Sequence, residues 1–279
     1  MKKTTLFFSL AIFFSTITMS QTRSSLNLKN GQKFLVENKA ETTSSTEVQG
    51  QSMDTKINVT TTYNIEVKDK TDNYHLTNTI SNMKMDMSMM GQEHKFDSDD
   101  STDMNGTMGT ALKDYINNPK DVEMDQTGKV ILKESDSTSG NMGQLASQMH
   151  ALETSGYGAE LAFQSLPKNM KVGDTWTDSS NEKNSVSKKI TYLAKEINGN
   201  IATITFSGPI STDANMENQG MEINTKISGK ISGQETVDIS TGIVQFNNSI
   251  IEQSGTVSAM GQDMPTSAKV TSTTTVKLL

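Results

Sequence analysis

The feature that most constrains the fold is a strict alternation of two kinds of residue near the start of the chain. Ile57, Val59, Thr61, Tyr63, Ile65 and Val67 occupy one phase between Lys56 and Lys68, and charged, amide or hydroxyl residues occupy the other. Successive side chains of a β-strand point to opposite faces of its sheet. We therefore predict an antiparallel strand with one buried face and one solvated face.

The same period recurs over most of the chain. Alternating or apolar strand patterns are found at residues 74–80, 83–89, 186–194, 201–206, 223–239, 243–251, 255–259 and 268–278. Asn198-Gly199 predicts a tight hairpin turn. The apolar phase changes between Ile80 and Met83, which predicts a bulge or break at Ser81-Asn82.

Helical spacing replaces this alternation only in the middle of the chain. We expect one helix within Gly106–Asn118 and further helical pieces between Met142 and Phe163, interrupted at Gly156-Tyr157-Gly158. The predicted fold class is therefore mainly β: a large antiparallel sheet, curved or in two layers, with one or two helices inserted mid-chain (α+β by count).

The segment Phe163–Thr177 reads as a joint between two halves. Pro167 ends any helix that arrives from before it, and Gly173-Asp174 is a turn signal that precedes Trp176, the one tryptophan of the chain. We expect an N-terminal β half with the helical segment at residues 21–165 and a C-terminal β half at 166–279, or one continuous domain over 21–279.

Residues 1–20 resemble a signal peptide of the Sec type. Lys2-Lys3 precede an apolar run from Leu6 to Ile17, and small residues stand before a cleavage site ahead of Gln21. The run is too short for a membrane anchor, and without cysteine there is no thiol for a lipid anchor and no disulfide. We expect an exported protein, periplasmic or secreted, that is neither lipid-anchored nor an integral membrane protein.

The charge of the mature chain argues against nucleic acid as a partner. The whole chain has 25 basic and 32 acidic residues, and removal of Lys2 and Lys3 with the leader leaves 23 and 32, a net charge of −9. That sign repels phosphate backbones and anionic lipid surfaces.

Catalytic signatures are missing from the sequence. It contains no cysteine, no Gly-x-Ser-x-Gly elbow and no His-Glu-x-x-His motif, and His75, His94 and His150 are scattered. We predict no catalytic residues, no cofactor-binding residues and no cofactor.

A run of methionines is the most specific candidate for a site. Met83, Met85, Met87 and Met89 alternate with polar residues, so one face of their strand is nearly all methionine. Flexible methionines fill irregular cores or line apolar cavities, whereas thioethers are also ligands for Cu(I). Met83, Met85, Met87, Met89 and Trp176 are the candidate ligand-lining residues, and Met83, Met85, Met87, Met89, Met90 and His94 are the candidate metal ligands.

Three functional hypotheses follow from these patterns. The leading one is a non-enzymatic envelope protein that binds an apolar ligand or an envelope partner in a Met-lined concavity. The second is soft-metal binding, Cu(I) in the periplasm, through Met83–Met90. The third is a hydrolase that uses paired carboxylates.

Several short motifs together resemble a family of exported proteins from Bacteroidetes-type bacteria, of the DUF6263 type. They are the signal peptide, Phe96-Asp97-Ser98-Asp99, a Gly128-Lys-Val130 turn, Leu166-Pro167 with Val172-Gly173-Asp174-Thr175-Trp176, and Asp238-Ile-Ser-Thr241-Gly242. The resemblance implies an exported, β-rich protein and brings no catalytic residues.

Overall fold

Twelve antiparallel strands form one open sheet in the computed structural model, which describes residues 22–131, 156–180, 186–218, 221–259 and 261–279. The strands are β1 (Lys33–Val48), β2 (Gln51–Lys70), β3 (Tyr74–Met89), β4 (Gln92–Asp97), β5 (Lys120–Met124), β6 (Val130–Ile131), β7 (Thr175–Ser180), β8 (Val186–Asn198), β9 (Ile201–Asn218), β10 (Met221–Asp238), β11 (Ile243–Ala259) and β12 (Gln262–Leu278). The predicted fold class is confirmed.

The sheet order joins both ends of the chain. Strands β7 to β12 form a meander in chain order, β12 pairs with β1, and β1, β2 and β3 continue the sheet. At the far edge, β3 pairs with β5 over its first half and with β4 over its second half. Strands from before and after the Pro167 joint therefore belong to one sheet.

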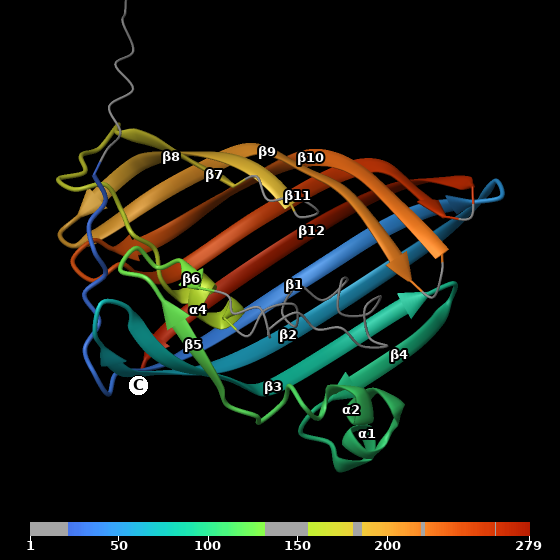
Figure 1. Ribbon diagram of the computed structural model, residues 1–279, viewed down its shortest axis with the longest axis horizontal. Coiled ribbons are helices and arrows are strands. Elements are labelled where there is room, and N and C mark those ends of the chain that lie inside the picture. Colours follow the sequence, from blue (N-terminus) through green and yellow to red (C-terminus); the bar gives the residue numbers. More distant parts are fainter. Residues whose placement is uncertain (1–21, 132–155, 181–185, 219–220, 260) are drawn as a thin grey trace, which may run out of the picture.

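The sheet curves into a trough (Figure 1). Two mid-strand glycines lie where neighbouring strands approach too closely for a side chain. A Cβ atom at Gly208 would lie 2.0 Å from the Lys189 carbonyl oxygen, and one at Gly255 would lie 2.0 Å from the Lys226 carbonyl oxygen. Glycines at such positions permit the strong coiling that a curved sheet needs.

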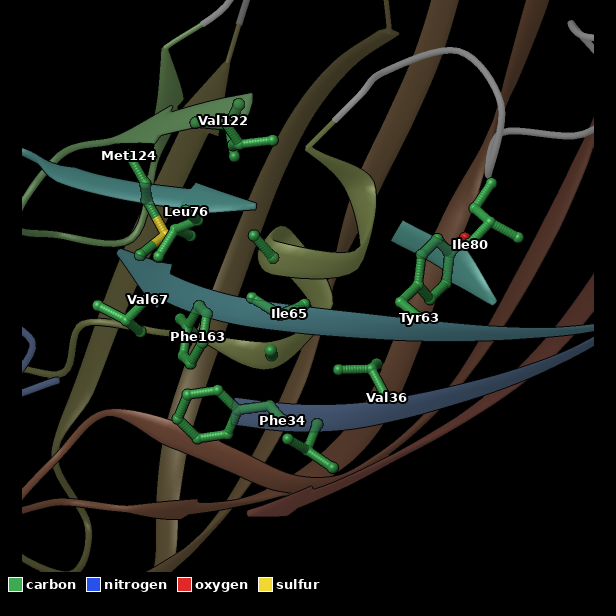
Figure 2. Close-up of a cluster of buried hydrophobic side chains, with 14 of the residues drawn as sticks. Phe34, Val36, Tyr63, Ile65, Val67, Leu76, Ile80, Val122, Met124 and Phe163 are labelled. Carbon is green, nitrogen blue, oxygen red and sulfur yellow. The ribbon is translucent and has the colours of Figure 1, made fainter. Parts of the chain in front are cut away.

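The hydrophobic core fills one end of the trough, on the face that we call the concave face. Figure 2 shows Phe34, Tyr63 and Ile65 of β1 and β2 together with Phe163 and side chains of β3 and β5. The rings of Phe34 and Phe163 meet edge to face, with their centroids 5.1 Å apart. The predicted alternation is confirmed here: in β2, Ile57, Tyr63, Ile65 and Val67 are buried and Lys56, Asn64 and Lys68 are exposed.

Short helices and a linking segment cover this end of the sheet. Helix α4 (Tyr157–Ala162) lies in the trough and contacts β1, β2 and β11 (Figure 1). Residues 22–28 connect several turns through backbone hydrogen bonds: Ser24 N donates to Leu166 O at 2.8 Å, Leu26 N to Gln126 O at 2.8 Å, and Asn27 N to Thr241 O at 3.0 Å. No helix within the described residues is long and apolar enough to cross a membrane.

The local predictions have mixed outcomes. The bulge is confirmed, because Thr62 pairs with Asn82 while Tyr63 pairs with Ile80, which leaves Ser81 as the extra residue. The Asn198-Gly199 turn between β8 and β9 is also confirmed. The prediction of separate strands at residues 243–251 and 255–259 was wrong. Strand β11 runs unbroken through both ranges, because close strand pairing tolerates Gly255.

The helix expected within Gly106–Asn118 is confirmed over its first half by α2 (Thr107–Leu112). A second short helix that was not expected, α1 (Ser101–Asn105), comes directly before it. Asp100 caps α1 by accepting a hydrogen bond from Thr102 N at 2.7 Å, so the helical segment starts inside the acidic run. The helical pieces expected around Met142, Leu145, Met149 and Leu152 lie outside the described residues.

Candidate ligand-binding site

Cross-strand pairing arranges the concave face beyond α4 into three successive rows. The polar row contains Thr61, Asn38, Thr274, Asn247 and Glu235. The small row contains Ala40, Ser272, Ser249 and Gly233. The apolar row contains Met87, Ile57, Val270, Ile251 and Ile231, with Thr42 as its one polar member. Facing residues on adjacent strands contact one another, so each row is a continuous strip across the trough.

The polar row is stabilised by hydrogen bonds between side chains. Asn38 Nδ2 donates to Thr274 Oγ1 and to Ser272 Oγ, both at 2.9 Å. Asn247 Nδ2 donates to Glu235 Oε2 at 3.1 Å. The carboxyl of Glu235 is 3% exposed, so the row ends in a buried ionisable group.

Burial sets the protonation of Glu235. Desolvation raises the pKa of its carboxyl from 4.5 to about 7, since water no longer stabilises the charged form. The side chains of Asn247 and Gln164 lower this pKa, and the negative charge of Asp178 raises it further. Oε1 of Glu235 has no hydrogen-bond partner of normal geometry within the described part of the chain.

Three other ionisable or aromatic groups lie around this carboxyl. The guanidinium of Arg23 forms an ion pair with Asp178 and also donates to Ser165 O at 2.7 Å. Burial raises the pKa of Tyr192 well above its usual value, with further contributions from the negative charges of Glu235 and Asp178 and an opposing one from Arg23.

Trp176, one of the candidate ligand-lining residues, lies at one end of the small row. Its ring stacks on Tyr192, with centroids 5.3 Å apart and planes 6° from parallel, and Tyr192 contacts Phe206 in turn. Pairing continues from Trp176 through Tyr192 and Phe206 to Gly233. The aromatic side chains of Trp176, Tyr192 and Phe206 therefore border the small row at this end.

The methionine candidates divide between the core and the surface. Met83 and Met85 are buried in the main core, Met87 is half-buried in the apolar row, Met89 is 41% exposed and Met90 is 71% exposed. Met85 aligns with the small row through Val59, at the end opposite Trp176. Strand β4 places the exposed His94 directly opposite Met87.

A separate hollow lies past the apolar row, at the end of the sheet opposite α4. Its volume is about 1090 Å³, and its lining comes from six strands and is rich in Ser, Thr, Lys and acidic residues. Met83, Met85 and Met87 do not line it, whereas Met53 and Met90 do.

The described residues contain no group of three or more His, Cys, Asp or Glu side chains that could hold a metal ion. Of the histidines, His75 and His94 lie on strands β3 and β4, and His150 lies outside the described residues. Thioether ligands are a different donor type and are considered with the proposed function.

Sequence reasoning did not single out Glu235, Asn247 or Arg23. A signal for Glu235 was present, because Ile227, Ile231 and Val237 share its phase in one strand, which places the carboxyl on the buried face. Arg23 had no such signal, since its ion pair with Asp178 joins residues 155 apart in sequence.

A family model described as "Family of unknown function (DUF6263)" matches residues 71–142 and 158–244, more than half of the chain. The chain belongs to this family. The matched segments include Glu235, Tyr192 and Met83–Met90. Ile57, Asn247, Ile251 and Val270 of the polar and apolar rows lie outside them. No curated protein matches the chain.

Two solved structures are similar to the fold of this family member. One is a structure titled "Lipid-protein interactions in lipovitellin", with a TM-score of 0.49 and 11% identity over 90% of this chain and 25% of that chain. The chain thus spans about a quarter of the lipovitellin chain. The other is an outer membrane channel from Pseudomonas putida F1, with a TM-score of 0.23 and 12% identity over 91% of this chain and 98% of that chain.

Proposed function

We propose that this protein is an exported, non-enzymatic binding protein that holds an apolar ligand on the concave face of its sheet. The observation that carries the proposal is the apolar row. Five of the six strands that it crosses contribute an apolar side chain, and β1 contributes Thr42; the five are Met87, Ile57, Val270, Ile251 and Ile231. All but Ile57 are only half-buried, so a ligand chain lying along the row covers additional apolar area. Each Å² of that area contributes about 25 cal/mol.

Adjacent isoleucines of β11 provide a matched test. Ile251 faces Val270 and Ile231 in the apolar row, whereas Ile250 faces Thr271 and Ser232 on the opposite face. We expect Ile251→Asp to weaken binding of the fluorescent fatty acid 11-(dansylamino)undecanoic acid by about tenfold or more, because a carboxylate in the row must be desolvated. Ile250→Asp should retain wild-type affinity, and equal binding by both variants would contradict the proposal.

Native mass spectrometry and lipid extraction of the purified wild-type protein provide the complementary test. We expect a co-purifying apolar molecule that is reduced in Ile251→Asp and retained in Ile250→Asp. Absence of any such molecule, together with no binding of the fluorescent fatty acid, would count against a carrier.

Export is the second part of the proposal and rests on the sequence of residues 1–20. Expression of the full chain in a Gram-negative host should place the protein in the periplasmic fraction or the medium, with Gln21 at its new N-terminus by mass spectrometry. Retention of Met1 on a cytoplasmic protein would show that the leader does not act as a signal peptide.

Cu(I) binding is a second candidate, and the pairing of β3 with β4 favours a specific form of it. Same-face residues of one strand are about 6.5–7 Å apart, too far for adjacent thioethers to share one ion easily, but directly opposite residues are about 5 Å apart. His94 stands opposite Met87, and Met89 follows on the same face. Met83 and Met85 are core residues, so the candidate ligands reduce to Met87, Met89, His94 and the neighbouring Met90.

Competition with bicinchoninate for Cu(I) tests this candidate. Met87→Leu/Met89→Leu should lose most of the uptake, as should His94→Ala, because each removes a soft or imidazole donor. Met85→Leu is the matched control, since it conserves volume in the core and should bind as wild type does. Equal uptake by the wild type and the double variant would eliminate the site.

The carboxylate-based hydrolase stays a prediction. Glu235 and Asp178 are the carboxylates near the small row from which such a mechanism would start, and Asp178 is already in an ion pair with Arg23.

A further inference from the structure

Glu235 presents a buried hydrogen-bond acceptor that the described structure leaves unused. Its Oε2 accepts from Asn247, while Oε1 has no hydrogen-bond partner. Buried polar atoms without a partner are uncommon in folded proteins, and leaving one unpaired costs about 1–3 kcal/mol. Such an atom can accept a hydrogen bond from a donor outside the described residues.

Two donors of this region are already committed to other atoms. Asn247 Nδ2 donates to Oε2 of Glu235, and the guanidinium of Arg23 donates to Ser165 O and pairs with Asp178. Gln164 approaches Glu235 closely enough to lower its pKa, without a hydrogen bond of normal geometry to Oε1. The approach of Gln164 is therefore too loose to satisfy Oε1, which stays available to a better-placed donor.

The position of Glu235 connects this acceptor to the surface on which the apolar ligand is proposed to lie. On β10 the next concave positions after Glu235 are Gly233 in the small row and Ile231 in the apolar row. Ser249 and Ser272 continue the small row across β11 and β12 with small side chains, whereas on β10 the ring of Phe206 lies against Gly233. A chain lying on the apolar row can thus place its end beside the carboxyl.

The charges around the carboxyl favour a cationic end. The charged and titratable groups that act on Glu235 are Asp178 of β7 and Tyr192 of β8, while β9 and β11 contribute Ile204 and Asn247. Arg23, in the segment before β1, pairs with Asp178 and acts on Tyr192. Arg23 neutralises Asp178, and the phenol of Tyr192 stays uncharged because burial raises its pKa. When Glu235 is ionised, the group as a whole has one excess negative charge.

We propose that the ligand is a long-chain amphiphile with an ammonium head group, whose N–H donates to Glu235 Oε1 while its chain lies on the apolar row. The inference rests on the proposed function and specifies the ligand class of that same site. An ammonium donor forms a charge-assisted hydrogen bond with a carboxylate, the strongest kind available to this acceptor.

Titrations of dodecylamine, dodecanol and dodecanoate, each kept below its micelle concentration, test the head group. Trp176 is the one tryptophan of the chain and stacks on Tyr192 beside the site, so its fluorescence reports binding. At pH 8.5 we expect the wild type to bind dodecylamine about tenfold or more tighter than dodecanol, with dodecanoate weakest. At pH 5.5 this preference should shrink, because Glu235 then carries a proton.

Glu235→Gln removes the charge and keeps the shape of the side chain, and should bind amine and alcohol equally. Glu252→Gln is the matched control: Glu252 is exposed on the other face of β11, so the preference for the amine should be unchanged. Circular dichroism confirms that both variants fold.

The outcomes separate the two proposals. If all three ligands bind the wild type and lose affinity in Ile251→Asp, yet Glu235→Gln keeps the amine preference, the head-group inference is wrong and the binding face stands. Tighter binding of dodecanoate than dodecylamine at pH 8.5 would also overturn the inference. If none of the three binds the wild type, the proposed function itself fails.

Discussion

The buried carboxyl of Glu235 opposes folding once it loses its proton. In the unfolded chain its carboxyl loses its proton near pH 4.5, but in the fold it holds the proton up to about pH 7. Between these values the folded state binds more protons, so the contribution of Glu235 to stability falls as the pH rises. A pKa raised by that much corresponds to roughly 3 kcal/mol lost by pH 8.

We therefore expect Glu235→Gln to be more stable than the wild type at pH 8, by up to about 3 kcal/mol, and to lose this advantage toward pH 4. Urea unfolding of both proteins from pH 4 to 8 measures the difference, in which the titration of all other groups cancels. Parallel stability curves for the two proteins would mean that the carboxyl ionises as freely in the fold as in the unfolded chain.

At the residue scale, the sequence predicted which side chains face the concave side of the sheet, but it predicted less well what each of these side chains does there. The phase of β2 and β3 correctly places Met83, Met85 and Met87 on the concave face. It cannot show that Met83 and Met85 belong to the main core while Met87 is only half-buried, because that depends on packing with residues distant in sequence. The link between Glu235 and Asp178 depends on three intervening strand pairings, which no local pattern encodes.

Among the elements, the long central strands pair regularly although they contain glycine, a residue that most strands avoid. β11 keeps its pairing with β10 through Gly255, which faces Ile227, although glycine weakens a strand by lacking a side chain to pack. The close approach of the Lys226 carbonyl explains its presence, since any larger residue would displace the neighbouring strand. Gly255, the first residue of the separate strand expected at 255–259, instead marks a place where one continuous strand coils.

Gly255→Val should therefore destabilise the protein despite the high β propensity of valine. A Cβ atom 2.0 Å from a backbone oxygen forces strand movement, and we expect a loss of about 3 kcal/mol in the free energy of unfolding. Ser254→Val, on the exposed face of the same strand, should change it by less than about 0.5 kcal/mol. Urea denaturation compares the two, and equal effects would show that the strands near Gly255 are less tightly coiled than the structure indicates.

Over the whole molecule, the pairing of β1 with β12 makes one sheet from both ends of the chain. Phe34 pairs with Leu278 and Thr46 with Thr266 across this seam, partners that lie more than 200 residues apart. Alternation predicts that each strand has a buried face, but the choice of partner at this distance follows from the curvature and the length of the complete sheet. This is why the sequence left open whether the two halves share one core.

The seam predicts that a change in the N-terminal half destabilises the C-terminal half to the same extent. Phe34→Ala removes a fully buried ring of β1 and should cost about 3–5 kcal/mol. If the sheet unfolds as one cooperative unit, Trp176 fluorescence, which reports on β7 at the opposite edge, shifts its urea midpoint by the same amount as far-UV circular dichroism. Phe246→Ala, at an exposed position of β11, should shift both much less. An unchanged Trp176 transition in Phe34→Ala would show instead that the two halves unfold independently and that the β1–β12 pairing does not couple them.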